Sequence, residues 1–281
     1  MAASIDDAPL QQHPLRKTRW PLTPHEHIPF SHSVAAELTA ATVAGALVAP
    51  IITIIDRAIF LNASGTQHLP AALLMGTREL FRHPIKSFRQ PACLFMFAVY
   101  AGTYATANTV HTICDYQGRD WFWPKFYATS VVNVGLCVAK DVYFTKWFGT
   151  GLPKPVPLRS YTLYTARDFL TVYASFNLPP IIADHLFQRQ GIPRPQAEVA
   201  AQLLAPCAVQ FVSTPMHLVG MDFYNRPGAT VGERFANVRK EYVKSTTARV
   251  GRIFAAFGLG GVANQRFRVI GQDWLKQWHS S

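Results

Sequence analysis

Residues 91–113 read PACLFMFAVYAGTYATANTVHTI, a run that holds no Asp, Glu, Lys or Arg. Residues 34–55 read VAAELTAATVAGALVAPIITII and hold one charged side chain, Glu37. A helix needs about 20 apolar residues to cross the hydrocarbon core of a bilayer, and both runs are long enough. These two stretches therefore predict membrane-spanning helices in an all-α integral membrane protein.

Four further stretches are apolar but carry polar residues within them, and they bring the candidate spans to six. A polar group inside a span is costly unless it faces the interior of a helix bundle or a wet cavity. The alternative is a soluble helical bundle in which two helices are fully buried. The four stretches are residues 125–144, 169–187, 197–221 and 250–263.

The composition agrees with a membrane protein and excludes several other classes. Of 281 residues, 49% are hydrophobic and 15% charged, whereas soluble domains carry about 25% charged residues. Such apolar content excludes long disorder. The four cysteines are widely spaced and form no CxxC pair, which excludes a small disulfide scaffold. The net charge of +11 would suit nucleic acid. Because the basic residues gather between apolar spans, however, we expect anionic membrane lipid such as cardiolipin as the partner, and no nucleic acid.

The basic residues also predict a topology. In a six-span chain, 16 Lys and Arg lie on one side of the membrane and ten on the other. An excess of Lys and Arg marks the side that is not translocated. We therefore expect three basic loops on that side and both termini on the opposite side.

The chain divides into a tail and a membrane domain. Residues 1–30 contain five prolines, which prevent a continuous helix, and no apolar core of a signal peptide. Within residues 31–281, the segment from Arg78 to Pro91 recurs in weaker form from Arg167 to Pro179. A repeat of this length predicts pseudo-symmetric helix pairs. The three predicted repeats are about 31–115, 116–191 and 192–281.

Three helix pairs, with a proline deep in an odd-numbered helix, resemble the mitochondrial carrier family. That family's motif is Pro-x-[Asp/Glu]-x-x-[Lys/Arg]-x-[Lys/Arg], which Pro50 and Pro215 begin here. The acidic positions hold Ile52, Val142 and His217 instead, so the motifs are degenerate. The resemblance implies six transmembrane helices in the mitochondrial inner membrane, with the outer membrane as the alternative.

The resemblance also implies site residues. Carriers close their cavity with ion pairs, and shifted acids and bases near the motif positions are the gate candidates. They bind substrate near the membrane midplane, where Arg252 matches an arginine motif and the other candidates fall near or inside spans. The gate candidates are Arg57, Asp56, Asp222, Gln265 and Arg268; the substrate-binding candidates are Arg252, Arg89, Asp184 and His185.

The sequence does not support a phosphate loop, a metal site or a catalytic residue set. The glycines of residues 258–261 lack the Gly-Lys-Ser/Thr ending of a phosphate loop, and close helix packing explains them better. His25 and His27 have the wrong spacing for two metal ligands on one helix face. No Ser-His-Asp, Cys-His or paired-carboxylate arrangement can be read, so we expect neither enzyme activity nor a cofactor or metal.

Two functions remain compatible with the sequence. The first is transport of a small anionic metabolite, which basic residues at the cavity positions favour. The second is a non-transporting scaffold that assembles with a membrane-protein partner, which the degenerate gate motifs favour.

Overall fold

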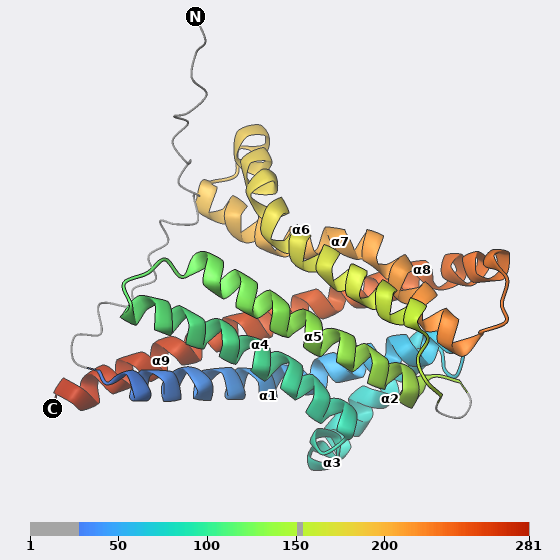
Figure 1. Ribbon diagram of the computed structural model, residues 1–281, viewed down its shortest axis with the longest axis horizontal. Coiled ribbons are helices and arrows are strands. Elements are labelled where there is room, and N and C mark those ends of the chain that lie inside the picture. Colours follow the sequence, from blue (N-terminus) through green and yellow to red (C-terminus); the bar gives the residue numbers. More distant parts are fainter. Residues whose placement is uncertain (1–27, 151–153, 281) are drawn as a thin grey trace, which may run out of the picture.

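The computed structural model describes residues 28–150 and 154–280, and in these ranges it contains helices and no strand (Figure 1). The prediction of an all-α fold is confirmed. Of the predicted N-terminal tail, residues 1–27 lie outside the described ranges. In chain order the helices are α1 (Phe30–Ala63), α2 (Leu69–Arg82), α3 (Pro84–Phe88), α4 (Pro91–Tyr116), α5 (Phe122–Phe148), α6 (Leu158–Gln190), α7 (Arg194–Asn225), α8 (Val231–Ile253), the π-helix η2 (Phe254–Gly261) and α9 (Val262–Ser280).

Local sequence signals set many of the helix boundaries. Proline stands in the first turn of α2, α3, α4 and α7, where its missing N–H would lack a partner in any case. The helix α8 begins with a capping box, in which Thr230 accepts a hydrogen bond from the Glu233 amide and donates its own amide to the Glu233 carboxylate. The helix α6 ends at Gly191, whose φ of 67° favours glycine.

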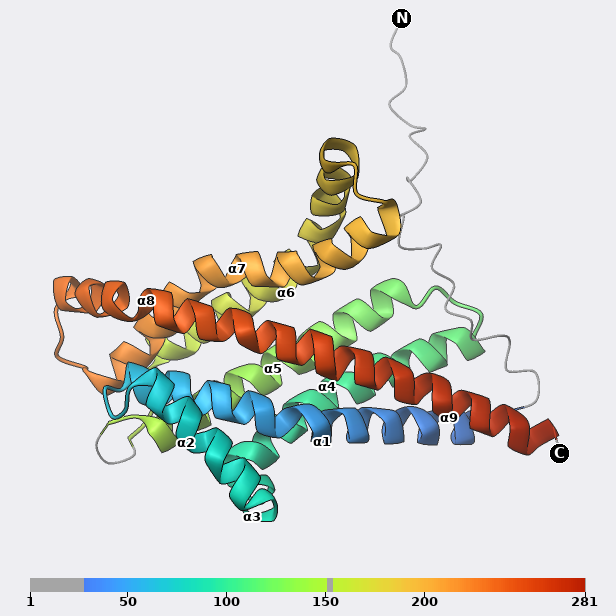
Figure 2. The same cartoon turned by 180° about the vertical axis from the view of Figure 1, so that it is seen from behind.

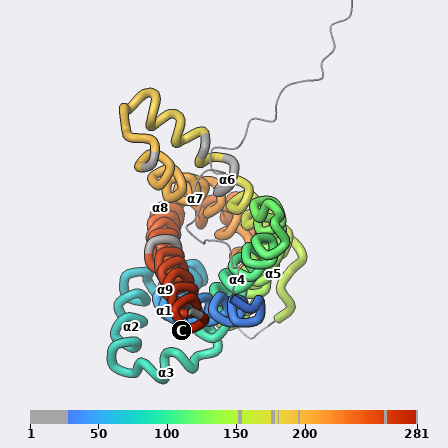
Figure 3. The backbone as a smooth tube through the Cα atoms, turned by 90° about the vertical axis from the view of Figure 1, so that its left-hand side faces the viewer, coloured from blue at the N-terminus to red at the C-terminus, as the bar shows by residue number. Residues whose placement is uncertain are grey.

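The long helices form a closed ring, which Figure 3 shows from one end. Around the ring, α1 contacts α4, α4 contacts α5, α5 contacts α6, and α6 contacts α7. The helix α7 contacts α8, and the continuous column of α8, η2 and α9 returns to α1. The short helices α2 and α3 lie outside this ring; α2 packs against α1, and α3 contacts α2 and the start of α4 (Figure 2).

Two close approaches explain glycines in the ring. A Cβ on Gly45 of α1 would lie 2.8 Å from the backbone nitrogen of Ala101 in α4. In η2, a Cβ on Gly260 would overlap the Tyr104 hydroxyl, which donates a hydrogen bond to the Ala256 carbonyl at 3.2 Å. Gly260 of this π-helix therefore lets α4 pack tightly against the column of α8, η2 and α9.

Besides its apolar core, the ring buries charged side chains and exposes large apolar ones. Glu37, Lys140 and Asp141 are at most 3% exposed, whereas Val131 and Phe169 are 74% and 67% exposed. Water-soluble proteins almost never bury such charges while exposing wide apolar surfaces. Lipid around the ring accounts for both features, so the soluble alternative is disfavoured.

Two helices are long and apolar enough to cross a membrane by themselves. They are α1, in which a stretch of 18 residues has a mean hydropathy of 2.2, and residues Gln196–Asn225 of α7, in which such a stretch has a mean hydropathy of 1.3. The other long helices of the described ranges are less apolar than these two. Their charged and polar residues lower the mean hydropathy, and the ring buries many of these residues. These helices include α4, so the ranking of residues 91–113 among the two strongest spans is wrong, and α7 takes that place.

The arrangement does not show three equivalent repeats. Short helices follow α1 only, and α8 continues directly through η2 into α9. The two copies of the sequence repeat also differ in environment, because Arg78 is exposed on α2 whereas Arg167 is buried in α6. The sequence similarity between these segments therefore does not place their arginines in equivalent positions.

Candidate functional site

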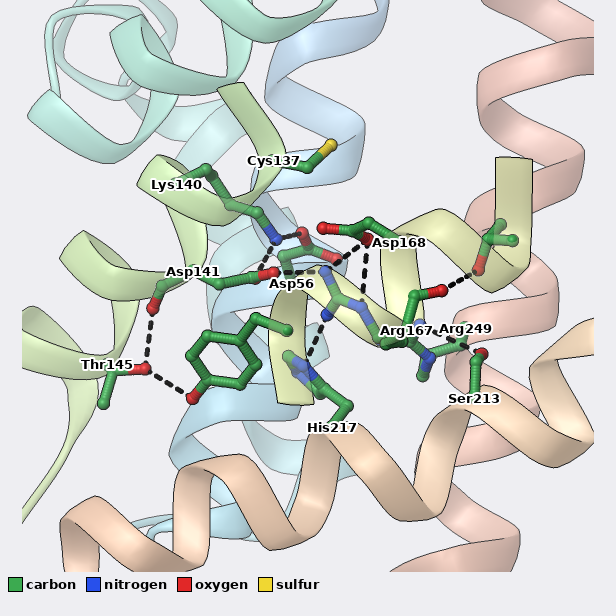
Figure 4. Close-up of polar contacts among 12 residues, drawn as sticks. Asp56, Cys137, Lys140, Asp141, Thr145, Arg167, Asp168, Ser213, His217 and Arg249 are labelled. Atoms are coloured by element: carbon green, nitrogen blue, oxygen red, sulfur yellow. Dashed lines mark hydrogen bonds and ion pairs between the residues drawn. The ribbon is translucent and has the colours of Figure 1, made fainter. Parts of the chain in front are cut away.

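Charged side chains and one histidine, from five helices of the ring, meet at one buried point; Figure 4 labels all of them except Arg252. Most of them are at least 90% buried, and each is held by a helix that also contributes to the ring. We call this group the central cluster; it comprises Asp56 of α1, Lys140 and Asp141 of α5, Arg167 and Asp168 of α6, His217 of α7, and Arg249 and Arg252 of α8.

Ion pairs connect α1, α5 and α6 within the cluster. The Lys140 ammonium lies 2.8 Å from Asp56 Oδ2 and 2.5 Å from Asp141 Oδ1. Arg167 bonds to the second oxygen of Asp141 and lies 2.5 Å from Asp168 Oδ1. Removing charges from water is costly, so these contacts compensate for burial rather than add much net stability.

Two further groups extend the cluster toward α7 and α8. His217 Nδ1 lies 2.6 Å from Arg167 Nη1. Because a guanidinium has no acceptor, this nitrogen of His217 must accept the hydrogen bond and the ring is neutral in this arrangement. Arg252 Nη1 lies 3.4 Å from Asp56 Oδ2 and so joins α8 to α1.

Arg249 differs from the other cations of the cluster. Its Nε donates to Gln210 Oε1 at 3.0 Å, and Nη2 lies 3.5 Å from Ser213 Oγ. In the described residues no carboxylate lies within ion-pair distance of its guanidinium, although the residue is only 4% exposed. A buried charge normally has a partner of opposite sign. Arg249 is therefore poised to receive an anion.

The cluster also has hydrogen-bonding groups that are not used. Asp168 Oδ2 and Arg252 Nε are buried, and neither has a hydrogen-bond partner in the described part of the chain. Buried polar atoms of this kind are uncommon and call for an explanation. Together with Arg249, they offer one acceptor for a cationic group and donors for an anionic group.

A second ion pair closes the ring at the other end of α1. Arg268 of α9 holds Glu37 with Nε at 2.5 Å and Nη2 at 3.0 Å. Next to it, Asn108 and Asn264 exchange side-chain hydrogen bonds at 3.0 Å. Glu37 precedes Asp56 on α1 by about 28 Å, at 1.5 Å per residue. The ion pair of Glu37 and the central cluster are therefore well separated along the length of α1.

The structure brings some of the residues predicted from the sequence together. Arg252 and Asp56 lie in the central cluster, and Arg268 pairs with Glu37. Three gate candidates lie elsewhere: Arg57 contacts Glu79 of α2 at 3.3 Å, Asp222 binds Arg226 and Arg234 at the junction of α7 and α8, and Gln265 is half-buried on α9.

The other substrate-binding candidates lie apart from the cluster. Arg89 is exposed at the end of α3. Asp184 is half-exposed near the end of α6 and lies 2.8 Å from Arg194 of α7, and His185 next to it is exposed. The hydropathy pattern places these two residues inside a span, whereas α6 and α7 carry them to the tip of their hairpin.

Sequence reasoning misses the residues at the centre of the cluster. The charge pattern assigns Arg167 and Arg249 to basic loops, but both are buried within helices. Lys140 and Asp141 stand out only as polar interruptions of a span. The available signal is the pairing of adjacent opposite charges, Lys140-Asp141 and Arg167-Asp168, in otherwise apolar surroundings.

A comparison with known families identifies the chain at this point. The family described as "probable citrulline exporter" matches residues 40–271, most of the chain. The chain belongs to this family. The expected membership of the mitochondrial carrier family is therefore wrong, and the degenerate motif positions, Ile52, Val142 and His217, fit the correction. No curated protein and no solved structure matched the chain.

The family description is that of a transport protein for a small metabolite rather than of an enzyme. Together with the outward-facing apolar surface of the ring, it supports a membrane transporter. The buried central cluster is the candidate substrate site of this transporter.

Proposed function

We propose that this protein exports a small zwitterionic amino acid across a membrane, and that the central cluster binds it. Citrulline, which the family description names, is the first candidate. The observation that carries the proposal is the combination of Arg249, a buried cation without an acid, and Asp168, a buried acid with an unused oxygen.

The two ends of a zwitterion match these two groups. The α-carboxylate would be held by Arg249, with Arg252 Nε as an additional donor, in charge-assisted hydrogen bonds. The α-ammonium would donate to Asp168 Oδ2. An uncharged side chain, such as the ureido group of citrulline, adds no further charge to a buried site.

A zwitterion fits better than the small anion expected from the sequence. A simple anion would supply a partner for Arg249 but would leave Asp168 Oδ2 unsatisfied. A simple cation would do the reverse. When both ends of a zwitterion bind, Arg249 and Asp168 Oδ2 each gain a hydrogen-bond partner, so neither group stays buried and unsatisfied.

The proposal also includes how the chain sits in the membrane. The six columns α1, α4, α5, α6, α7 and α8–η2–α9 would each cross the bilayer, so both termini would lie on the same side. The mitochondrial inner membrane stays a prediction, which co-localisation of the tagged full-length chain checks. Anionic membrane lipid is the partner that we propose for the surface.

Exchange of radiolabelled citrulline in proteoliposomes tests the proposal. Arg249→Gln should reduce exchange by about 10-fold or more, because a hydrogen bond to a charged group contributes about 1.5–3 kcal/mol. Arg239→Gln, an exposed site on the same helix, is the matched control and should leave exchange unchanged.

Competition experiments separate the candidate substrates. Unlabelled citrulline should compete for exchange, whereas its decarboxylated amine and its deaminated acid, which each lack one charge, should not. Competition by anions alone would reject the zwitterion. The absence of exchange for every solute, together with a stable co-purifying membrane protein, would instead support the scaffold alternative.

A further inference from the structure

The segment of residues 69–89, which forms α2 and α3, lies outside the ring and covers part of α1 (Figures 1 and 2). Its inner face is fully used. Leu69, Ala72 and Gly76 are buried, and a Cβ on Gly76 would lie 3.0 Å from the side chain of Ile54 in α1. This face holds the segment in place and leaves its other surface free.

The one acid of the segment is also engaged on the inner side. Glu79 contacts Arg57 of α1 at 3.3 Å and accepts a hydrogen bond from Gln90 at 2.8 Å. No other Asp or Glu occurs between residues 69 and 89. The outer surface of the segment therefore carries no negative charge of its own.

That outer surface combines large apolar side chains with cations. Leu74, Phe81 and Ile85 are 71%, 82% and 69% exposed. Leu74 and Phe81 are seven residues apart and therefore share one face of α2. Beside them lie exposed cations, none within ion-pair distance of a carboxylate in the described residues: Arg78, Arg82, Lys86 and Arg89.

The segment lies immediately before α4 in the chain, which bears on its depth in the membrane. The helix α3 ends at Phe88, and α4 begins at Pro91 and carries no charged residue before Asp115. If α4 crosses the bilayer, as in the function proposed above, its first residues enter the hydrocarbon core. The last turn of α2 and all of α3 must then lie at the membrane surface.

We propose that the outer surface of α2 and α3 binds the anionic headgroups of phospholipids. Its apolar side chains enter the boundary between headgroups and acyl chains, and its cations contact the phosphates. Long basic side chains reach outward from such a depth while their stems remain in apolar surroundings. Because the cations have no acid partners, an anionic lipid surface fits this face better than a neutral apolar protein surface.

The test compares lipids with purified full-length protein in a neutral detergent. Added phosphatidylglycerol should raise the Tm by about 3 °C or more above the effect of the same amount of phosphatidylcholine. The triple variant Arg82→Gln, Lys86→Gln, Arg89→Gln should lose at least half of this difference.

The matched control removes the same charge elsewhere. The variant Arg119→Gln, Arg189→Gln, Arg266→Gln changes three exposed arginines outside the segment and should keep the full response. An equal response of both triple variants would overturn the proposal.

A second measurement places the apolar face directly. The variant Phe81→Trp adds a tryptophan to this face. In proteoliposomes, its fluorescence should be quenched by lipids that are brominated near the top of their acyl chains. No added quenching, or protection of residue 81 by a second copy or another protein, would overturn the proposal. Because neither measurement needs a substrate, failure of citrulline exchange would leave this result intact.

Discussion

Lys140 should be the most sensitive single position of the central cluster. Its ammonium neutralises Asp56 at 2.8 Å and Asp141 at 2.5 Å, and the residue is 3% exposed. Lys140→Met keeps a long flexible side chain but removes the charge. Removing one partner of a buried ion pair typically costs about 3–5 kcal/mol, because it leaves an uncompensated charge.

The remaining contacts place the expected cost at the lower end of this range. Asp141 keeps Arg167, and Asp56 keeps Arg252 at 3.4 Å. We therefore expect Lys140→Met to lower the free energy of unfolding by about 3 kcal/mol. Asp56→Asn is also expected to destabilise, since it deprives Arg252 of its acid. The double variant should be more stable than the sum of the two single effects by about 1–2 kcal/mol, because it removes both partners of one pair.

Unfolding by sodium dodecyl sulfate in mixed micelles, followed by circular dichroism, measures these differences. Lys146→Met, a partly exposed site on the same helix, is the control, with an expected change within about 0.5 kcal/mol. A loss below about 1 kcal/mol for Lys140→Met, or strict additivity in the double variant, would refute the ion-pair network as described.

Three other predictions concern the rest of the ring. Gly45→Ala should destabilise the protein by about 1–3 kcal/mol, because the added Cβ meets the backbone of α4. Gly135→Ala is the control and should not destabilise it, because nothing lies within 4 Å of a Cβ at that position. Thermal unfolding in detergent compares the two variants. Arg268→Gln leaves Glu37 without a cation and should lower the Tm more than the exposed Arg266→Gln does in the same assay. Hydrogen bonds from the N-cap threonine hold the pKa of Glu233 below its usual value. The stabilisation of α8 by these bonds is therefore present above the ordinary carboxyl pKa and is lost as the pH falls through the lowered pKa. Hydrogen exchange, corrected for its intrinsic pH dependence, should show that acid reduces protection in the first turn of α8, and Glu233→Gln should abolish this dependence on pH.

The all-α fold can be read from the sequence because apolar runs are local signals. The apolar stretch of residues 91–113 lies within α4, and that of residues 34–55 lies within α1, which extends further at both ends. The weaker spans also fall on long helices, but their ends shift where polar residues are buried. At residues 250–263, for example, hydropathy shows only the middle of a continuous column from α8 to α9.

The candidate site is harder to predict, because it depends on contacts between distant helices. Motifs single out Arg252 and Asp56, and the fold does join them across 196 residues of sequence. Arg249, by contrast, has the same local sequence character as a surface arginine. Its importance follows only from its burial and from the lack of a carboxylate within ion-pair distance in the described residues, and neither is a local property of the chain.

The ion pairs that close the ring also bear on the order in which the protein is made. Of the described helices, α1 is synthesised first. It carries the two buried acids Glu37 and Asp56, and the cation that neutralises Glu37 is Arg268 of α9, which is synthesised after the other described helices. The middle helices are different, since α5 and α6 each carry adjacent opposite charges, Lys140-Asp141 and Arg167-Asp168. They can therefore enter the bilayer almost self-neutralised, whereas Glu37 of α1 meets its cation only after α9 has been made. A chain cut short before α9 would keep Glu37 in the membrane without its cation, where an unpaired acid is costly.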